Sequence, residues 1–213
     1  MTIEGLRIKI RKKYFFHTSA IRSRFINNND FSIISNNCWG GFVYQSYGLE
    51  YNTPTVGLFF MAEEYIKFLS DLKHYIYDYE LTFIKPEESS YVSFLSKDSR
   101  FGSYPIGKLG DVEIEFLHYK SEAEAYDKWE RRKKRINWDK LLVKFNDQNE
   151  CNLKLFNKFS ELNFRNKLFF GVNQDYASDF SIIKRRKQKC IYASQEPVGA
   201  TSRCNINRLI NNL

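Results

Sequence analysis

The apolar positions of the chain follow two periods, which divide it into alternating extended and helical segments. Leu6, Ile10, Tyr14 and His17 recur every three or four residues, which predicts a basic amphipathic helix over residues 5–25. Similar spacing predicts further helices over residues 62–75, 121–137 and 153–162. Short apolar runs predict strands over residues 31–36, 55–60, 80–84, 104–106, 112–117, 141–145 and 168–172.

The order of these segments predicts the fold class. Strands and helices alternate repeatedly, which is typical of an α/β domain with a largely parallel sheet. We therefore expect a single α/β domain over residues 1–213, built as a three-layer α/β/α sandwich around a mixed sheet, with a basic helix in residues 1–25. The strands on either side of residues 107–111 are expected to form a hairpin. Residues 85–103 are expected to be a loop, and residues 178–213 to be irregular or to lie at the sheet edge.

The stretch SNNCWGG, Ser35–Gly41, follows the first predicted strand. In open α/β sheets ligands bind beyond the carboxyl ends of the strands, where loops lead into helices. Cys38 would lie at such a position, where the exposed amides of the next helix favour a thiolate, so it is a candidate nucleophile. The alternative is a tight turn with Cys38 and Trp39 packed underneath, because cysteine is among the most buried residue types.

The other residues of this stretch are candidate contacts for a substrate. Amide side chains bind polar groups, and glycines let a substrate or phosphate approach the backbone closely. The predicted substrate contacts here are Asn36, Asn37, Trp39, Gly40 and Gly41. In the alternative arrangement the asparagines and glycines serve only the turn.

His118 is the candidate base, because it lies at another junction between a strand and a helix. If the strands before Cys38 and His118 are neighbours in the sheet, the two side chains can form a nucleophile–base pair. The alternative is a structural histidine that is hydrogen-bonded to the backbone.

The predicted helix over residues 121–137 places one arginine on its apolar face. Ser121 and Glu124 form a capping box at its start. Arg132 shares a stripe with Ala125, Trp129 and Ile136. A buried guanidinium needs an anion, so we expect Arg132 to bind either an internal carboxylate or a substrate phosphate.

Positive charge is concentrated at the two ends of the chain, whose net charge is +8. Residues 1–25 hold seven Lys or Arg residues against one acid, and residues 184–189 hold five more. Basic ends indicate an anionic partner such as a lipid surface or a sugar phosphate, with residues 6–16 as the expected membrane contact. The alternative is that both ends are solvated arms without a partner. Nucleic-acid binding is not expected, because the aromatic residues do not interleave with the basic runs.

Several classes of protein and site are not indicated. The chain has no apolar run of about 18 residues and no apolar centre near its start, so neither a membrane span nor a signal peptide is expected. Its four cysteines are widely separated, which argues against a disulfide framework or a structural zinc site. Dinucleotide, Walker A, G-x-S-x-G and D-x-D motifs are absent. We therefore expect no metal and no cofactor, and a cytoplasmic location with or without peripheral membrane contact.

Two blocks of the chain carry a resemblance to a known family. SNNCWGGFVYQSYGLEYNTPTVGLFF (35–60) and YPIGKLGDVEIEFLHYKSEAEAYDKWERRKKRINWDKLLVKFND (104–147) resemble an uncharacterised bacterial family whose members are described as exopolysaccharide-biosynthesis proteins. The resemblance covers about residues 5–200 and implies a pathway without naming a reaction. A fainter likeness is to papain-like cysteine peptidases of bacteria, which share a strand-end cysteine, a strand-end histidine and an arginine-rich helix.

These observations lead to one functional prediction and two alternatives. The leading prediction is an enzyme that transfers a group to, or modifies, a phosphorylated or nucleotide-linked precursor of a surface polysaccharide. Cys38 would be its nucleophile and His118 its base. The first alternative is a non-catalytic, membrane-peripheral assembly partner of the polysaccharide machinery, which docks through residues 6–16. The second is a papain-like Cys–His hydrolase.

Overall fold

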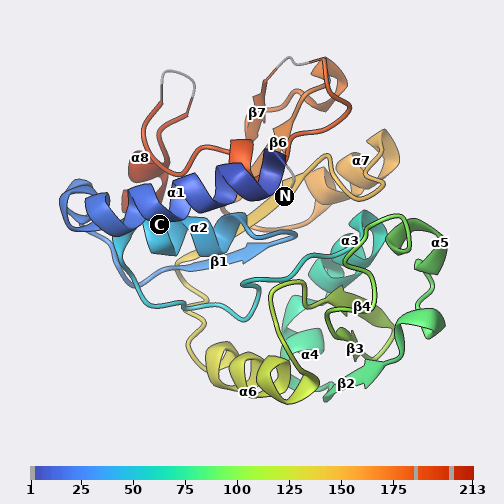
Figure 1. Cartoon of the computed structure of the whole chain (residues 1–213). Helices are drawn as coiled ribbons and strands as arrows, with labels where there is room; N and C mark the ends of the chain where they lie inside the picture. Colours follow the sequence, from blue (N-terminus) through green and yellow to red (C-terminus); the bar gives the residue numbers. More distant parts are fainter. Residues whose placement is uncertain (1–2, 185–186, 202–203) are drawn as a thin grey trace.

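A four-stranded parallel sheet forms the centre of the protein (Figure 1). The computed structural model describes residues 3–184, 187–201 and 204–213. The sheet order is β1-β5-β6-β7, with β1 (Ser32–Ser35), β5 (Leu141–Asn146), β6 (Lys167–Gly171) and β7 (Ser181–Ile183). Each neighbouring pair is parallel. All carboxyl ends therefore lie at one edge, and the predicted largely parallel sheet is confirmed.

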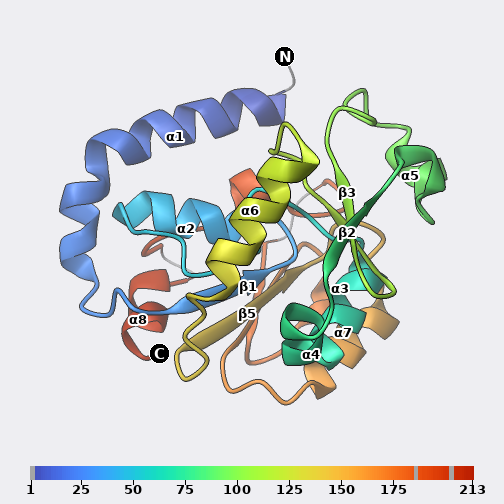
Figure 2. The same cartoon turned by 90° about the horizontal axis from the view of Figure 1, so that it is seen from below.

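Helices cover both faces of this sheet, because its central strands are apolar on both sides. On one face Ile33, Leu142 and Phe170 share a core with α1 (Ile3–Arg22), α2 (Trp39–Tyr47) and α8 (Ile206–Asn211). On the other face Ile34, Val143 and Phe169 share a core with α3 (Ala62–Ser70) and α7 (Leu153–Glu161). Figure 2 shows α1 along the outside of the molecule, with α2 on its inner side.

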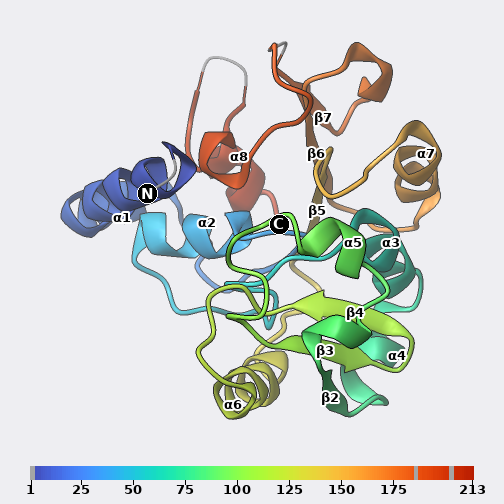
Figure 3. The same cartoon turned by 45° about the vertical axis from the view of Figure 1, so that its right-hand side comes forward.

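A second sheet packs beyond this latter core, and it is antiparallel throughout (Figure 3). Its order is β2-β3-β4, with β2 (Leu81–Ile84), β3 (Ile106–Leu109) and β4 (Val112–Glu115). Helices α4 (Leu72–Tyr77) and α6 (Glu122–Lys133) contribute to the same core. The expected hairpin is confirmed as β3–β4. The expectation of one mixed sheet is wrong, because the antiparallel strands form a separate sheet.

Residues 53–60 connect the two sheets, and they are not the strand that the apolar run predicts. The one regular pairing in this segment is an isolated antiparallel bridge between Phe59 and Glu115. The amide of Phe60 donates to the carbonyl of Asn36 (3.0 Å), and the amide of His118 donates to the carbonyl of Gly57 (2.9 Å). Gly57 has a φ of +75°, which interrupts an extended strand. The segment thus holds the ends of β1 and β4 beside each other.

Other boundaries also differ from the sequence-based expectations. The predicted helix over residues 62–75 divides at Asp71 into α3 and α4. The expected loop over residues 85–103 contains the short helix α5 (Val92–Leu95). Residues 178–213 were expected to be irregular or to lie at the sheet edge. They include β7, which is the edge strand of the parallel sheet, and the helix α8. Short 3₁₀ turns η1 (Ser23–Phe25), η2 (Pro86–Glu88), η3 (Gln174–Tyr176) and η4 (Ala193–Gln195) complete the described structure. Arg185 and Arg186 of the basic cluster lie outside the described residues.

Candidate active site

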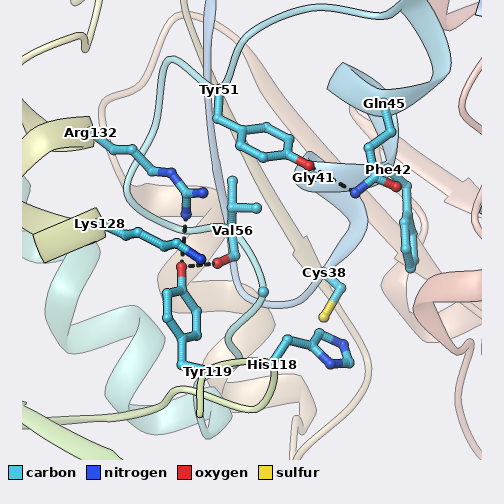
Figure 4. Close-up of a pocket in the computed structure, with 11 residues that line it drawn as sticks. Cys38, Gly41, Phe42, Gln45, Tyr51, Val56, His118, Tyr119, Lys128 and Arg132 are labelled. Atoms are coloured by element: carbon cyan, nitrogen blue, oxygen red, sulfur yellow. Dashed lines mark hydrogen bonds between the residues drawn. The ribbon is translucent and has the colours of Figure 1, made fainter. Parts of the chain in front are cut away.

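A cavity of about 200 Å³ opens between α2, the connecting segment, the loop after β4 and α6 (Figure 4). It lies near the carboxyl end of β1, where the parallel topology predicts a ligand site. Its lining consists of Cys38, Gly41, Phe42, Gln45, Tyr51, Val56, Gly57, His118, Tyr119, Lys128 and Arg132.

Cys38 occupies the N-cap position of α2, directly after the turn that ends β1. Its Sγ lies 3.9 Å from the carbonyl oxygen of Leu58. The side chain of Asn37 caps the helix, because its Oδ1 accepts a hydrogen bond from the amide of Trp39 at 3.0 Å. The first-turn amides of a helix carry a partial positive charge, so a thiolate at this position is favoured by the helix.

His118 lies in the loop between β4 and α6, and the structure brings it into the same cavity as Cys38. Figure 4 shows the thiol of Cys38 pointing toward the imidazole ring. The sequence-based prediction required the strands before Cys38 and His118, β1 and β4, to be neighbours in one sheet, and they are not. The two side chains approach each other because the connecting segment holds His118 close: the carbonyl of Gly57 accepts a hydrogen bond from the amide of His118, and a Cβ at Gly57 would lie only 3.4 Å from the Cβ of His118.

Arg132 enters the cavity from α6 with 8% of its surface exposed. Its Nη1 donates to the phenol oxygen of Tyr119 at 2.8 Å, and its guanidinium carbon lies 4.9 Å from the ring centre of Tyr51. Within the described residues no carboxylate lies within ion-pair distance of Arg132. The internal carboxylate, one of the two expected partners, is therefore not found there.

Tyr119 fixes this arginine without neutralising it. Its hydroxyl donates to the carbonyl of Val56 at 2.5 Å while it accepts from Arg132. Burial raises the pKa of the Tyr119 phenol, and the positive charge of Arg132 opposes that rise. A second cation, Lys128, lies one helical turn before Arg132, with its Nζ 5.4 Å from the Tyr119 ring centre. Lys128 pairs with Glu124, so Arg132 is the cation of the two without an acidic partner among the described residues.

Four of the predicted substrate contacts do not line the cavity: Asn36, Asn37, Trp39 and Gly40. Asn36 and Asn37 are buried, and the Nδ2 of Asn36 donates to Asn146 Oδ1 at 2.8 Å. Trp39 is fully buried, and its indole donates to the carbonyl of Pro197 at 2.7 Å. A Cβ at Gly40 would lie 3.2 Å from Ile33, so this glycine lets α2 pack on β1. Gly41 is the member of this stretch that lines the cavity, as Arg132 does from α6.

A buried ion pair organises these residues. Lys144 on β5 is fully buried, and its Nζ lies 2.7 Å from Oε1 of Glu196. The same Nζ donates to Oδ1 of Asn37 at 3.0 Å, while Asn146 donates to Glu196 at 2.8 Å. Burial lowers the pKa of Lys144, and the charge of Glu196 opposes this. We call these residues the Lys144 network: Asn36, Asn37, Lys144, Asn146 and Glu196. It fixes the turn that presents Cys38.

Part of the cavity lining, and all of the support that β5 provides, were not among the residues expected from the sequence. The sequence did indicate Tyr119 and Lys128 as possible site residues, because Tyr119 directly follows His118 and Lys128 precedes Arg132 by one helical turn. Lys144 had a clearer signal, because a lysine inside the apolar run LLVKF must find a partner if the strand is buried. Gln45, Tyr51 and Gly57 had no signal, since only the folded chain brings them to the cavity.

In the described part of the chain, no group of three or more His, Cys, Asp or Glu side chains is arranged to hold a metal ion. No helix among the described residues has both the length and the apolar character needed to cross a membrane.

Comparison with known proteins gives the family. A family model described as "Domain of unknown function (DUF1919)" matches residues 9–209. The chain belongs to the DUF1919 family. An uncharacterized protein of Haemophilus influenzae is 30% identical over 167 residues, which are 78% of this chain and 74% of that protein. The DUF1919 match includes every residue of the cavity lining. The exopolysaccharide role has no support in these comparisons and stays a prediction.

Proposed function

We propose that this DUF1919 protein is a cysteine-dependent acyl-transfer enzyme whose substrate carries an anionic group. The observation that carries the proposal is the content of one cavity. It holds a helix-N-terminal cysteine, a histidine and an arginine that has no acidic partner among the described residues. A thiol beside an imidazole is the arrangement of a nucleophile and its base. A buried arginine without a carboxylate favours an anionic ligand.

The reaction would proceed in two balanced steps. His118 takes the proton of Cys38, and the thiolate attacks the acyl carbon of the donor, so that a carbon–sulfur bond forms. The bond to the leaving group then breaks, and the leaving group receives the proton from His118. In the second step a hydroxyl attacks the thioester and gives its proton to His118, the carbon–sulfur bond breaks, and the released Cys38 thiolate takes that proton back from His118. With water as the acceptor the same steps describe the hydrolase alternative.

The cavity limits what part of a substrate enters it. A volume of about 200 Å³ is smaller than that of typical sites for drug-sized ligands, so only the reacting end and its anionic group would fit. Arg132 offers a planar fork that suits a phosphate or a carboxylate. A phosphorylated or nucleotide-linked sugar with a bulky remainder outside the cavity, the predicted partner, is compatible with this arrangement.

Alkylation rates test the nucleophile without knowledge of the substrate. Burial raises the pKa of Cys190 and of Cys204 to about 11 and also raises that of Cys151. We expect iodoacetamide at neutral pH to label Cys38 at least about tenfold faster than these three thiols. The variant His118→Ala should slow labelling of Cys38 alone. Equal rates at all four cysteines would contradict the proposal.

Protection of Cys38 from alkylation by a bound anion tests whether Arg132 binds an anionic group. Inorganic phosphate at millimolar concentration should slow the alkylation of Cys38 in the native protein, because a bound anion shields the thiol. The variant Arg132→Gln should lose this protection. Arg131→Gln is the matched control, since Arg131 is on the same helix but exposed and outside the cavity lining. Protection that survives in Arg132→Gln would show that the anion binds elsewhere.

A further inference from the structure

Helix α1 presents an apolar surface to solvent. The described residues include eleven large apolar side chains that are exposed, and six of them lie within residues 6–25. Their exposed fractions run from 45% for Leu6 to 83% for Phe16. This surface continues onto the turn η1, and we call it the α1 outer face: Leu6, Ile10, Tyr14, Phe16, Ile21 and, in η1, Phe25. Isolated exposed apolar residues are ordinary, but a concentration of this kind marks a contact surface.

The opposite side of α1 is fixed to the body of the protein, so the outer face is held in place. Phe15 is 3% exposed and belongs to the core that α2 shares. Nε of Arg22 donates to the carbonyl of Ser46 at 3.0 Å, and Nη1 of Arg11 donates to the carbonyl of Ala193 at 2.9 Å. Figure 2 shows the helix along the periphery of the fold. Packing within the chain therefore explains the inner side of α1 and leaves the outer face uncovered.

Apolar and basic side chains are mixed on the α1 outer face. Leu6, Ile10 and Tyr14 follow one another at four-residue spacing, so they lie along one side of the helix. The exposed basic residues around this row are Arg7, Lys9, Lys13 and Arg24. No acidic residue occurs in residues 5–25. An exposed apolar row with flanking basic residues is typical of a helix that lies in a membrane interface.

We propose that the α1 outer face docks on a membrane surface that contains anionic lipids, with the helix axis parallel to the bilayer. The apolar row would enter the boundary between headgroups and acyl chains, and the basic side chains would contact lipid phosphates. A second copy of the chain fits less well, because two such faces would bring their basic residues together. This inference rests on residues outside the cavity and is independent of the proposed acyl transfer.

Vesicle flotation with the full chain tests the proposal. The native protein should float with vesicles of phosphatidylcholine and phosphatidylglycerol, but not with phosphatidylcholine alone, and high salt should release it. Replacement of Lys9 and Lys13 by Gln should weaken binding by about fivefold for each charge, because one basic residue near an anionic surface contributes about 1 kcal/mol. The double variant Ile10→Ser/Ile21→Ser should weaken it by about tenfold or more.

A matched variant separates the α1 outer face from general surface hydrophobicity. Tyr126→Ser/Leu153→Ser removes two apolar side chains, 39% and 47% exposed, from α6 and α7. It should bind vesicles as the native protein does, and thermal unfolding should show that both double variants fold. Equal loss in both double variants, equal binding to neutral vesicles or no flotation of the native protein would overturn the proposal. A native dimer that Ile10→Ser/Ile21→Ser converts to a monomer would overturn it in favour of self-association.

Discussion

Two buried cations lie near the turn that presents Cys38, and they differ in their partners. Lys144 contacts the turn itself, and Glu196 and two asparagines surround its ammonium group. Arg132 lines the cavity with Cys38, and a phenol and an aromatic ring hold its guanidinium. Burial makes both charges costly, but only Lys144 has a carboxylate among the described residues.

This difference separates a structural charge from a charge that is available to a ligand. The Lys144 network is closed, because nearly all its polar atoms bind one another; Oε2 of Glu196 is the buried atom without a partner there. The cavity is open, and an anion entering it would supply the missing partner of Arg132. We therefore expect the two cations to respond differently to substitution.

Replacement of Lys144 by Met should have the largest effect. It would leave the carboxylate of Glu196 buried without its cation, and breaking a buried pair in this way costs about 3–5 kcal/mol of unfolding free energy. Urea denaturation measures the loss. The double variant Lys144→Met/Glu196→Gln should recover part of it, because no unpaired charge then remains. A single-variant loss below about 1 kcal/mol would contradict a structural role for the pair.

Glu115 tests whether a buried carboxyl group without a hydrogen-bond partner limits stability. Its carboxyl group is fully buried on β4, neither oxygen has a hydrogen-bond partner among the described residues, and burial raises its pKa well above the ordinary value. The folded protein therefore keeps a proton that the unfolded chain releases as pH rises above about 4.5. Stability should fall with rising pH by up to about 1.4 kcal/mol per unit while this difference lasts.

The variant Glu115→Met removes this proton linkage. Compared with the native protein, it should gain more unfolding free energy at pH 8 than at pH 5, by at least about 1 kcal/mol. Urea denaturation at both pH values measures the difference. An equal gain at the two values would show that Glu115 does not carry the linkage.

Gly57 tests how the cavity is assembled. Its φ of +75° disfavours a side chain, and an added Cβ would lie 3.3 Å from the Tyr119 ring. Gly57→Ala should cost about 1–2 kcal/mol of stability and slow the alkylation of Cys38, because His118 must shift. Gly102→Ala is the matched control, since Gly102 has a φ of +79° but nothing within 4 Å of an added Cβ. The control should lose similar stability and keep the native alkylation rate.

Replacement of Arg132 by Met should have the smallest effect on stability, within about 1 kcal/mol, because it leaves no buried carboxylate unpaired. It should nevertheless abolish the phosphate protection of Cys38. Urea denaturation beside the Lys144 variant makes the comparison direct. A loss of 3 kcal/mol or more would place Arg132 with Lys144 as a structural charge.

Local pattern predicted most of the elements correctly. The apolar runs around residues 31–36, 141–145 and 168–172 became β1, β5 and β6. Ser121 is the N-cap of α6 as predicted, and its Oγ accepts a hydrogen bond from the amide of Glu124, but the Glu124 side chain accepts from the amide of Lys120 and not from that of Ser121. The prediction of a strand over residues 55–60 was wrong, because a positive φ at Gly57 interrupts the extended backbone and the pairing with β4 is limited to one bridge at Phe59. Apolar character alone did not distinguish a strand from a buried connection.

The sequence by itself determined which residues are candidates for the site: a cysteine after a strand, a histidine after another and an arginine on an apolar helix face. Only the tertiary structure decided that these three line one cavity, because the connecting segment joins β1 to β4 across two sheets. It also decided which buried cation has an acidic partner, since Glu196 reaches Lys144 from 52 positions along the chain. Contacts between distant segments depend on how the sheets and helices pack, and local pattern does not contain that information.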